Sequence, residues 1–230
     1  MGKLQSPIAL ATSGPHAATV KALPPLVFDY RATPLSMINN GWSIQFDCEA
    51  GSSVADGGTP YGLLQFHFHS PSEHTLDGRS FPLEMHLVHA GADGEPALVV
   101  GVFVREGAAN RTLANAFSKL PRAEGGRLAP AGEIVRVGSL LPSSLGYFSY
   151  DGSLTTLACT EGIQWRVLRT PIEMSKAQIG AYRALPRFGQ TNRPLQPIGG
   201  RTVWLAAVEQ SVGATVKSPP ARRRALRRRP

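Results

Sequence analysis

Histidines carry the strongest chemical signal in this 230-residue chain, because five of its six lie between residues 67 and 89. In the segment LLQFHFHS, an extended strand would place Gln65, His67 and His69 on one face and the two phenylalanines on the other. Two imidazoles separated by one residue would then point to the same side. The segment therefore predicts a pair of metal ligands on a single strand.

A second histidine-bearing segment, LEMHLVHA, would place Glu84, His86 and Val88 on one face of another strand. If the two strands are neighbours, His86 joins the first pair and completes a site of three ring nitrogens. Three neutral imidazoles leave Zn²⁺ one open position for water, which is typical of catalytic rather than structural zinc sites. The spacing therefore predicts a catalytic Zn²⁺ site.

Two polar residues are expected to orient these rings. Gln65 lies on the same face as His67, and Glu84 lies on the same face as His86. Each can accept a hydrogen bond from the ring nitrogen that does not face the metal, which fixes the tautomer and the orientation of the ring. These partners strengthen the zinc interpretation over that of ordinary buried histidines.

The remaining histidines, His16, His74 and His89, are predicted to take no part in metal binding. His89 would point to the opposite face from His86, and His74 falls in a turn segment. The run HFHSPSE also fits the H-x-H-x₃-E half-motif of a cupin, which would prefer iron or manganese and use Glu73 as a further ligand. A cupin needs another histidine later in the chain, and none follows His89, so this alternative is weak.

The elements that must position these residues are predicted to be short strands, because 24 glycines and 19 prolines interrupt the chain. Alternating or β-branched and aromatic segments predict strands at 26–30, 35–40, 42–48, 62–69, 83–90, 97–104 and 163–168. Helices are predicted at 112–120, with Thr112 as N-cap, and at 175–184, where Ser175 and Gln178 would form a capping box. Residues 1–25 contain four prolines and are predicted to be irregular. The fold class is therefore mainly β.

The net charge of +8 is concentrated at the C-terminal end. Lys217 and six arginines between 222 and 229 leave residues 1–216 close to neutral, so no specific nucleic-acid partner is expected for the body of the chain. We predict a single catalytic domain over 1–206 and a basic, disordered tail over 207–230, whose arginines could engage nucleic acid or acidic lipid. No apolar run approaches the roughly 20 residues that span a bilayer.

Several motifs occur in the order and spacing of α-class carbonic anhydrases, which the chain resembles over about residues 5–205. These are QSPI (5–8), NNGW (39–42), QFHFH (65–69), SEHTLDG (72–78), EMHLVH (84–89), GSLTT (152–156), IQWRVL (163–168) and NRPLQPIGGR (192–201). The resemblance implies a zinc lyase that interconverts carbon dioxide and bicarbonate. It also implies a large, mostly antiparallel central sheet with short helices at its periphery.

The resemblance assigns roles residue by residue. His67, His69 and His86 fall on the family's zinc ligands, and Gln65 and Glu84 fall on the partners of two of them. A main-chain carbonyl near position 191 is expected to orient the third ring. These assignments agree with the faces deduced from strand alternation.

The resemblance also implies how the reaction is organised. Thr155 matches the threonine that accepts the proton of a zinc-bound hydroxide, and Glu73 matches the carboxylate that receives the threonine's own O–H. The residues that match the family's substrate pocket are Val88, Val99, Leu154, Thr156 and Trp165. The alternative within this family is a non-catalytic binding module, but such members usually lack a zinc ligand, and all three are present here.

Two departures from the family bear on function. Trp42 stands where a histidine usually exports the proton, and an indole has no basic nitrogen, so we expect proton export to limit the rate. The N-terminal segment that usually precedes QSPI is missing, together with the cysteine that pairs with the position of Cys159 in extracellular members. Cys159 is therefore expected to be reduced, although a single disulfide with Cys48, the other cysteine of the chain, is possible. The start has no signal peptide, which predicts a cytoplasmic protein as written, or a periplasmic or secreted one if the N-terminus is truncated.

Overall fold

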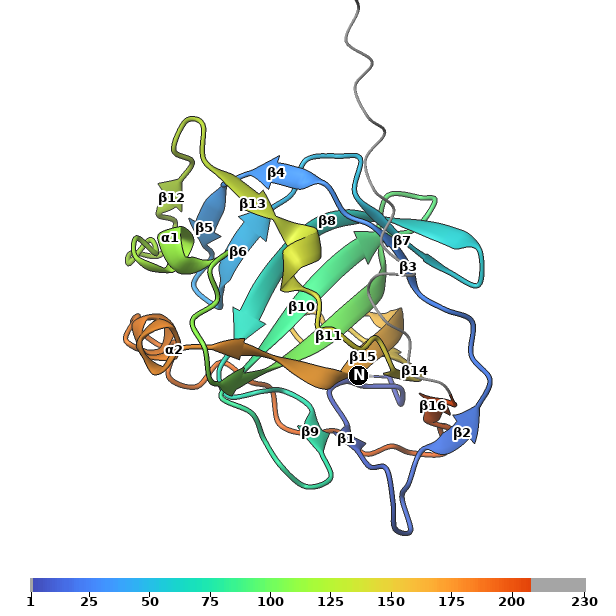
Figure 1. Cartoon of the computed structure of the whole chain (residues 1–230). Coiled ribbons are helices and arrows are strands. Elements are labelled where there is room, and N and C mark those ends of the chain that lie inside the picture. The colour runs from blue at the N-terminus through green and yellow to red at the C-terminus, as the bar shows by residue number, and fades with distance from the viewer. Residues whose placement is uncertain (1, 208–230) are drawn as a thin grey trace, which may run out of the picture.

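A computed structural model describes residues 2–207, and its centre is a sheet of twelve strands (Figure 1). The helical elements are α1 (Ala114–Phe117), the 3₁₀ helix η1 (Val137–Leu140) and α2 (Lys176–Arg183). The strands are β1 (Ala9–Leu10), β2 (Thr19–Lys21), β3 (Val27–Asp29), β4 (Ala32–Pro34), β5 (Met37–Asn39), β6 (Ile44–Asp47), β7 (Ser53–Asp56), β8 (Thr59–His69), β9 (Thr75–Leu76), β10 (Leu83–Ala90), β11 (Pro96–Glu106), β12 (Arg127–Leu128), β13 (Ile134–Arg136), β14 (Tyr147–Ser153), β15 (Glu161–Met174) and β16 (Trp204–Ala206).

The long path through the sheet runs β12-β5-β6-β8-β10-β11-β15-β14-β16-β2, with β7 pairing with both β8 and β3. Within this sheet all strand pairs are antiparallel except β11 with β15 and β16 with β2. The predicted mainly-β fold with a mostly antiparallel central sheet is therefore confirmed. Each of the seven predicted strand segments also overlaps an observed strand, so the apolar patterning of these segments correctly predicted a strand in each.

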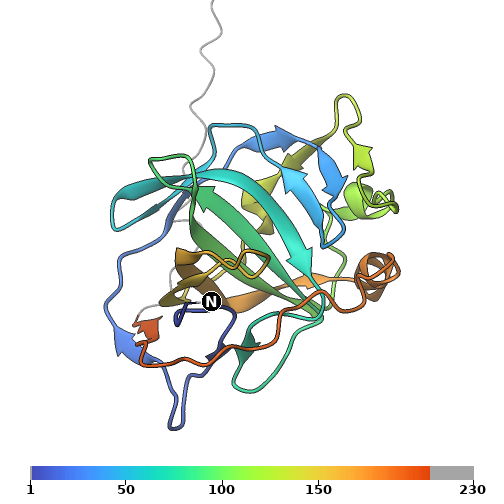
Figure 2. The same ribbon diagram turned by 180° about the vertical axis from the view of Figure 1, so that it is seen from behind.

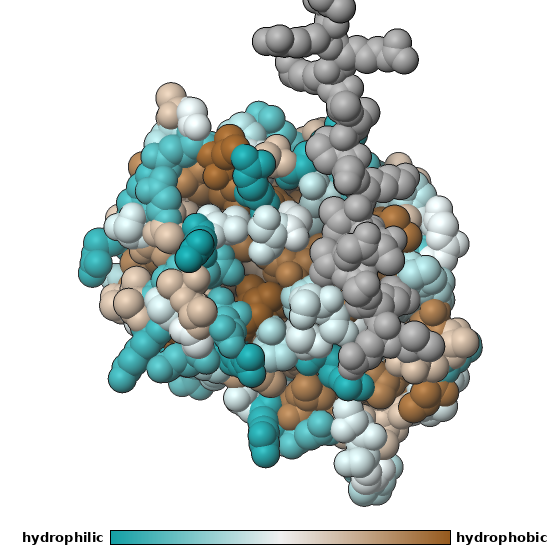
Figure 3. All heavy atoms as spheres, in the orientation of Figure 1, coloured by the Kyte–Doolittle hydropathy of each residue, from teal (hydrophilic) through white to brown (hydrophobic). Residues whose placement is uncertain are grey.

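The central strands separate two apolar layers. Phe66 and Phe68 of β8 point into the larger core, together with Met85 and Leu87 of β10. Figures 1 and 3 show this side, where β13 and η1 cross in front of the central strands and brown apolar residues lie around them. The residues between these positions point to the other side, which Figure 2 shows with the loop between β14 and β15 in front of the strands. The candidate site lies on that second side.

The predicted N-terminal cap is correct for one of the two predicted helices and wrong for the other. Ser175 caps α2 and forms the expected capping box with Gln178, so this prediction is confirmed. The prediction that Thr112 caps a helix over 112–120 is wrong, because α1 is a single turn that starts after Leu113 and has no side-chain cap. Instead, the Asn110 side chain accepts the N–H of Leu113 at 3.2 Å and holds the preceding residues in a turn.

The N-terminal region is less irregular than its prolines suggest. β1 pairs in parallel with β9, and β2 pairs in parallel with β16, so both N-terminal strands hydrogen-bond to strands that are distant in the sequence. Cys48 and Cys159 are not joined to each other, and burial raises the pKa of the Cys48 thiol to about 12. Within residues 2–207 no helix has both the length and the apolar character needed to cross a bilayer. The predicted basic tail lies outside the described residues from 208 onward.

Candidate active site

The register of β8 and β10 brings the three predicted ligand histidines together. His86 lies directly opposite His67, and Glu84 lies opposite His69. β6 and β7 flank β8 on its other side, and β11 flanks β10, so both backbones are held along their length. The neighbouring strands on which the zinc prediction depended are therefore present, and all three side chains lie on the same side of the sheet.

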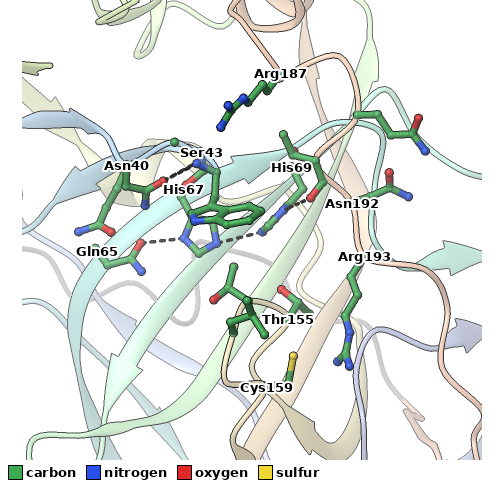
Figure 4. A pocket seen from close by; sticks show the side chains of 17 residues that line it. Asn40, Ser43, Gln65, His67, His69, Thr155, Cys159, Arg187, Asn192 and Arg193 are labelled. Atoms are coloured by element: carbon green, nitrogen blue, oxygen red, sulfur yellow. Dashed lines mark hydrogen bonds between the residues drawn. The ribbon is translucent and has the colours of Figure 1, made fainter. Parts of the chain in front are cut away.

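The three imidazoles surround one point. The Nε2 atoms of His67 and His69 are 3.1 Å apart, and Figure 4 shows these two rings facing each other. The ring centre of His86 lies 5.4 Å from that of His67 and 4.7 Å from that of His69. One nitrogen from each ring falls within 4.8 Å of the others. This spacing is compatible with a single metal ion bound by three nitrogens.

The outward nitrogen of every ring already has a partner. His67 Nδ1 lies 2.8 Å from Gln65 Oε1, and His86 Nε2 lies 3.0 Å from Glu84 Oε1. His69 Nδ1 lies 3.2 Å from the main-chain carbonyl of Thr191, the position expected from the resemblance. Because these acceptors fix the tautomers, the nitrogens that face the common point without a proton are Nε2 of His67, Nε2 of His69 and Nδ1 of His86.

Electrostatics keep two of these rings neutral, which is the form that binds metal. Burial lowers the pKa of His67 well below its usual value, and the nearby His69 and His86 rings lower it further. Burial also lowers the pKa of His69, although Glu73 opposes this. Burial disfavours charge on His86 too, but Glu84 and Glu73 outweigh it and raise its pKa. A metal therefore competes with a proton mainly at His86.

His74 has a structural role that the sequence did not reveal. Its Nδ1 lies 2.7 Å from Glu84 Oε1, its backbone N–H donates to Glu84 Oε2, and its Nε2 lies 2.6 Å from the Tyr150 hydroxyl. That hydroxyl in turn donates to Ser6 Oγ at 3.0 Å. The group His74, Glu84 and His86 is also compact enough for an ion, but its facing atoms are already joined by hydrogen bonds. This network fixes Glu84 and, through it, the His86 ring.

The sequence could not show this network because its members lie on separate elements. Ser6 and His74 both occur within family-like motifs, and this was the only available signal. Tyr150 lies on β14, a strand that was not predicted. The other two histidines are remote from the site, as predicted: His16 is exposed in a turn, and His89 is buried on the opposite face of β10 against Tyr30.

Glu73 and Thr155 lie near the histidines but are not joined by a hydrogen bond in the described part of the chain. Glu73 Oε1 accepts the backbone N–H of Arg193 at 2.8 Å and lies 3.5 Å from His69 Nδ1. Glu73 Oε2 is buried, lies 3.9 Å from His86 Nδ1 and has no hydrogen-bond partner among residues 2–207. A buried carboxylate oxygen without a donor is costly, so this atom is a ready acceptor.

A small inner cavity of about 130 Å³ adjoins the histidines. His67 and His86 form part of its wall, and the indole of Trp165 is 4.9 Å from the His86 ring and donates Nε1–H to the Ser153 carbonyl. The predicted substrate residues all line this cavity: Val88, Val99, Leu154, Thr156 and Trp165. Gln65, Pro96 and Thr155 complete it. Polar and apolar groups share this lining, and its small volume together with the apolar part of its wall suits a small, weakly polar molecule.

A larger outer cavity of about 640 Å³ connects the histidines with solvent (Figure 4). Its mouth consists of loop residues 40–43, 155–159 and 187–193. Trp42 lies in this mouth with 66% of its surface exposed. Asn40 Oδ1 accepts the N–H groups of Trp42 and Ser43, and Gly41 between them adopts a φ of +85°, so the turn that presents the indole is well defined.

Comparisons with known proteins show the family of this chain. A family model described as eukaryotic-type carbonic anhydrase matches residues 1–207. The chain is 38% identical to a carbonic anhydrase of Pectobacterium carotovorum, over 88% of this chain and 80% of the relative. It is also 38% identical to human carbonic anhydrase 7, over 88% of each chain.

A solved structure leads to the same family. The α-carbonic anhydrase of Thermovibrio ammonificans, solved with the inhibitor sulfanilamide, superposes with a TM-score of 0.82 at 35% identity, covering 88% of this chain and 87% of the other. The match extends over the whole described domain, which leaves the cupin alternative without support. The chain therefore belongs to the eukaryotic-type, or α-class, carbonic anhydrase family, whose general activity is the reversible hydration of carbon dioxide.

Proposed function

We propose that this protein hydrates carbon dioxide reversibly at a Zn²⁺ ion held by Nε2 of His67, Nε2 of His69 and Nδ1 of His86. The observation that carries this proposal is the pairing of the other three ring nitrogens with acceptors, which leaves three unprotonated nitrogens around a common point. When bound, Zn²⁺ lowers the pKa of water to about 7, a value known from carbonic anhydrase itself, and so supplies a nucleophile at neutral pH.

Thr155 and Glu73 orient the nucleophile in this proposal. The Thr155 hydroxyl accepts a hydrogen bond from the attacking oxygen and donates its own O–H to Glu73 Oε2, the buried oxygen that lacks a donor. The N–H of Arg193 holds the other carboxylate oxygen and so fixes the direction of Glu73. An ionised carboxylate only accepts hydrogen bonds, so the Thr155 hydroxyl must donate its proton to Glu73 and accept one from the attacking oxygen. The hydrogen of the attacking oxygen then points to Thr155, and one of its lone pairs faces the substrate.

The inner cavity holds carbon dioxide by exclusion of water rather than by hydrogen bonds. Val88, Val99, Leu154 and Trp165 supply apolar walls next to His67 and His86. Carbon dioxide has no net charge or hydrogen to donate, so it gains by leaving water for the apolar side of this cavity. Thr156 lies on the same wall and is exposed toward the outer cavity, where it can contact the more polar bicarbonate product.

The test is stopped-flow hydration of carbon dioxide by protein of known zinc content, before and after treatment with a chelator. We expect activity that disappears with the metal and returns when Zn²⁺ is added back. The competing candidate is a non-catalytic binding module of the same family. Protein that carries one Zn²⁺ per chain but does not hydrate carbon dioxide would favour that module and contradict the proposal.

A further inference from the structure

Hydration releases a proton, and the outer cavity offers no side chain to accept it. Apart from His67 and His69, its described lining contains no histidine, aspartate or glutamate. The other groups of note are the guanidinium groups of Arg187 and Arg193, which carry hydrogen-bond donors and no acceptor, and the buried thiol of Cys159. Amides, hydroxyls, an indole and aliphatic groups make up the rest. The proton acceptor is therefore not a side chain of this lining.

The charges of this lining favour one kind of acceptor, because it contains two guanidinium groups and no carboxylate. Arg193 is anchored, since its Nη1 donates to the Ser6 carbonyl at 2.6 Å. Arg187 is 79% exposed, and its nearest acidic partner, Glu124, is 3.8 Å away and itself 69% exposed. Such an exposed pair interacts weakly, so Arg187 keeps most of its capacity to attract an anion.

The backbone supports this placement of Arg187. Its φ of +69° is in the left-handed region, which non-glycine residues rarely adopt. Figure 4 shows its guanidinium extending from the 187–193 loop toward the side of the cavity where Ser43 and His67 lie. The positive charge is therefore presented over the opening rather than directed away from it.

We infer that the released proton leaves on a small dianionic base, with hydrogen phosphate as the representative, which Arg187 attracts to the mouth of the outer cavity. This inference rests on the proposed function. In the overall step, carbon dioxide, water and HPO₄²⁻ give HCO₃⁻ and H₂PO₄⁻: an O–H bond of water breaks, a C–O bond forms, and the proton ends on a phosphate oxygen. Nothing is oxidised or reduced.

The change in charge also favours turnover. The dianion is attracted to Arg187 about twice as strongly as the monoanion that it becomes, so protonation promotes release. A neutral base of similar strength, such as imidazole, gains no attraction and becomes a cation near two guanidinium groups. Phosphate should therefore be the better acceptor of the two at equal concentration of base.

The experiment measures kcat for hydration at saturating carbon dioxide, near neutral pH and at fixed ionic strength, while either phosphate or imidazole is varied at low concentration. The slope of kcat against base concentration reports proton transfer to that buffer. We expect a steeper slope for phosphate in the wild type and a phosphate slope about 3- to 10-fold lower in Arg187→Gln, with the imidazole slope unchanged or higher. Arg187→Lys should retain the phosphate preference because it retains the charge.

Arg79→Gln is the matched control, since Arg79 is exposed in the turn after β9 and lies outside both cavities. An unchanged phosphate slope in Arg187→Gln, or an equal loss for both buffers, would overturn the inference. In that case a normal kcat/KM for carbon dioxide would leave the proposed function standing. Wild-type protein with zinc but no hydration activity would instead remove the proposed function and this inference together.

Discussion

Two regions of the site differ in burial and in hydrogen bonding. The floor consists of the histidines on β8 and β10, and the mouth consists of loops. On the floor, His69 and His86 are almost completely buried, and each outward ring nitrogen has an acceptor. At the mouth, Trp42 and Leu157 are 66% and 81% exposed. The floor therefore fixes whether the chemistry occurs at all, whereas the mouth adjusts how quickly protons and products leave.

The largest expected effect is on the floor. We expect zinc binding to weaken by more than about 100-fold in each of His67→Ala, His69→Ala and His86→Ala, and hydration to fall to background. The loss of affinity should exceed the roughly 10- to 100-fold that typically follows removal of a hydrogen-bond partner of a metal ligand. Zinc content after dialysis and stopped-flow rates would measure both effects. His16→Ala, which removes an exposed histidine, is the control. Normal zinc content and rate in any one of the three variants would refute that ligand assignment.

The second prediction concerns the boundary between floor and mouth. Thr155→Ala should keep its zinc but lose about 10²-fold in kcat/KM, because the attacking oxygen loses its orienting acceptor and Glu73 Oε2 remains without a donor. Thr155→Ser keeps the hydroxyl and should retain most of the rate. Equal rates for Thr155→Ala and wild type would exclude the relay.

The third prediction belongs to the mouth alone. Trp42→His places a group with a pKa near neutrality in the outer cavity and should raise kcat at low buffer by about 10- to 100-fold. kcat/KM, which reports the attack on carbon dioxide, should change little. In the wild type kcat should rise with buffer concentration, and in the variant it should not. A wild-type kcat that is independent of buffer would mean that another group carries the proton.

This division also explains what the sequence could predict. Alternation along 65–69 and 84–88 predicted which side chains share a face, because a strand allows only two directions. The pairing of those strands, the Thr191 carbonyl and the His74–Tyr150 contact depend on segments far apart in the chain. Without the family resemblance, no local pattern would have indicated them. The 187–193 loop has no periodic pattern, so the position of Arg187 over the outer cavity required the structure.

The smallest predicted effect is on the pH dependence of folding stability and concerns His89. This residue lies on the same strand as His86 but on the opposite face. Its Nδ1 is 3.3 Å from the Leu98 carbonyl, which can only accept, so Nδ1 carries the proton and Nε2 accepts from the Tyr30 hydroxyl at 2.7 Å. Burial lowers the pKa of His89 to about 3, against about 6.5 in an unfolded chain. Between these values only the unfolded state takes up the proton, so stability decreases as the pH falls below 6.5.

His89→Gln removes this titration while keeping one donor and one acceptor. The variant should be less stable than wild type at pH 7, because the glutamine fits the buried site less well. The difference should then narrow by about 1 kcal/mol between pH 7 and pH 5.5, because only the wild type loses stability through this group. Urea unfolding at several pH values measures this, and zinc content should be unaffected because the metal lies on the other face of β10. A difference that stays constant over this range would show that His89 is protonated equally easily in the folded and unfolded states, and would contradict the lowering of its pKa by burial.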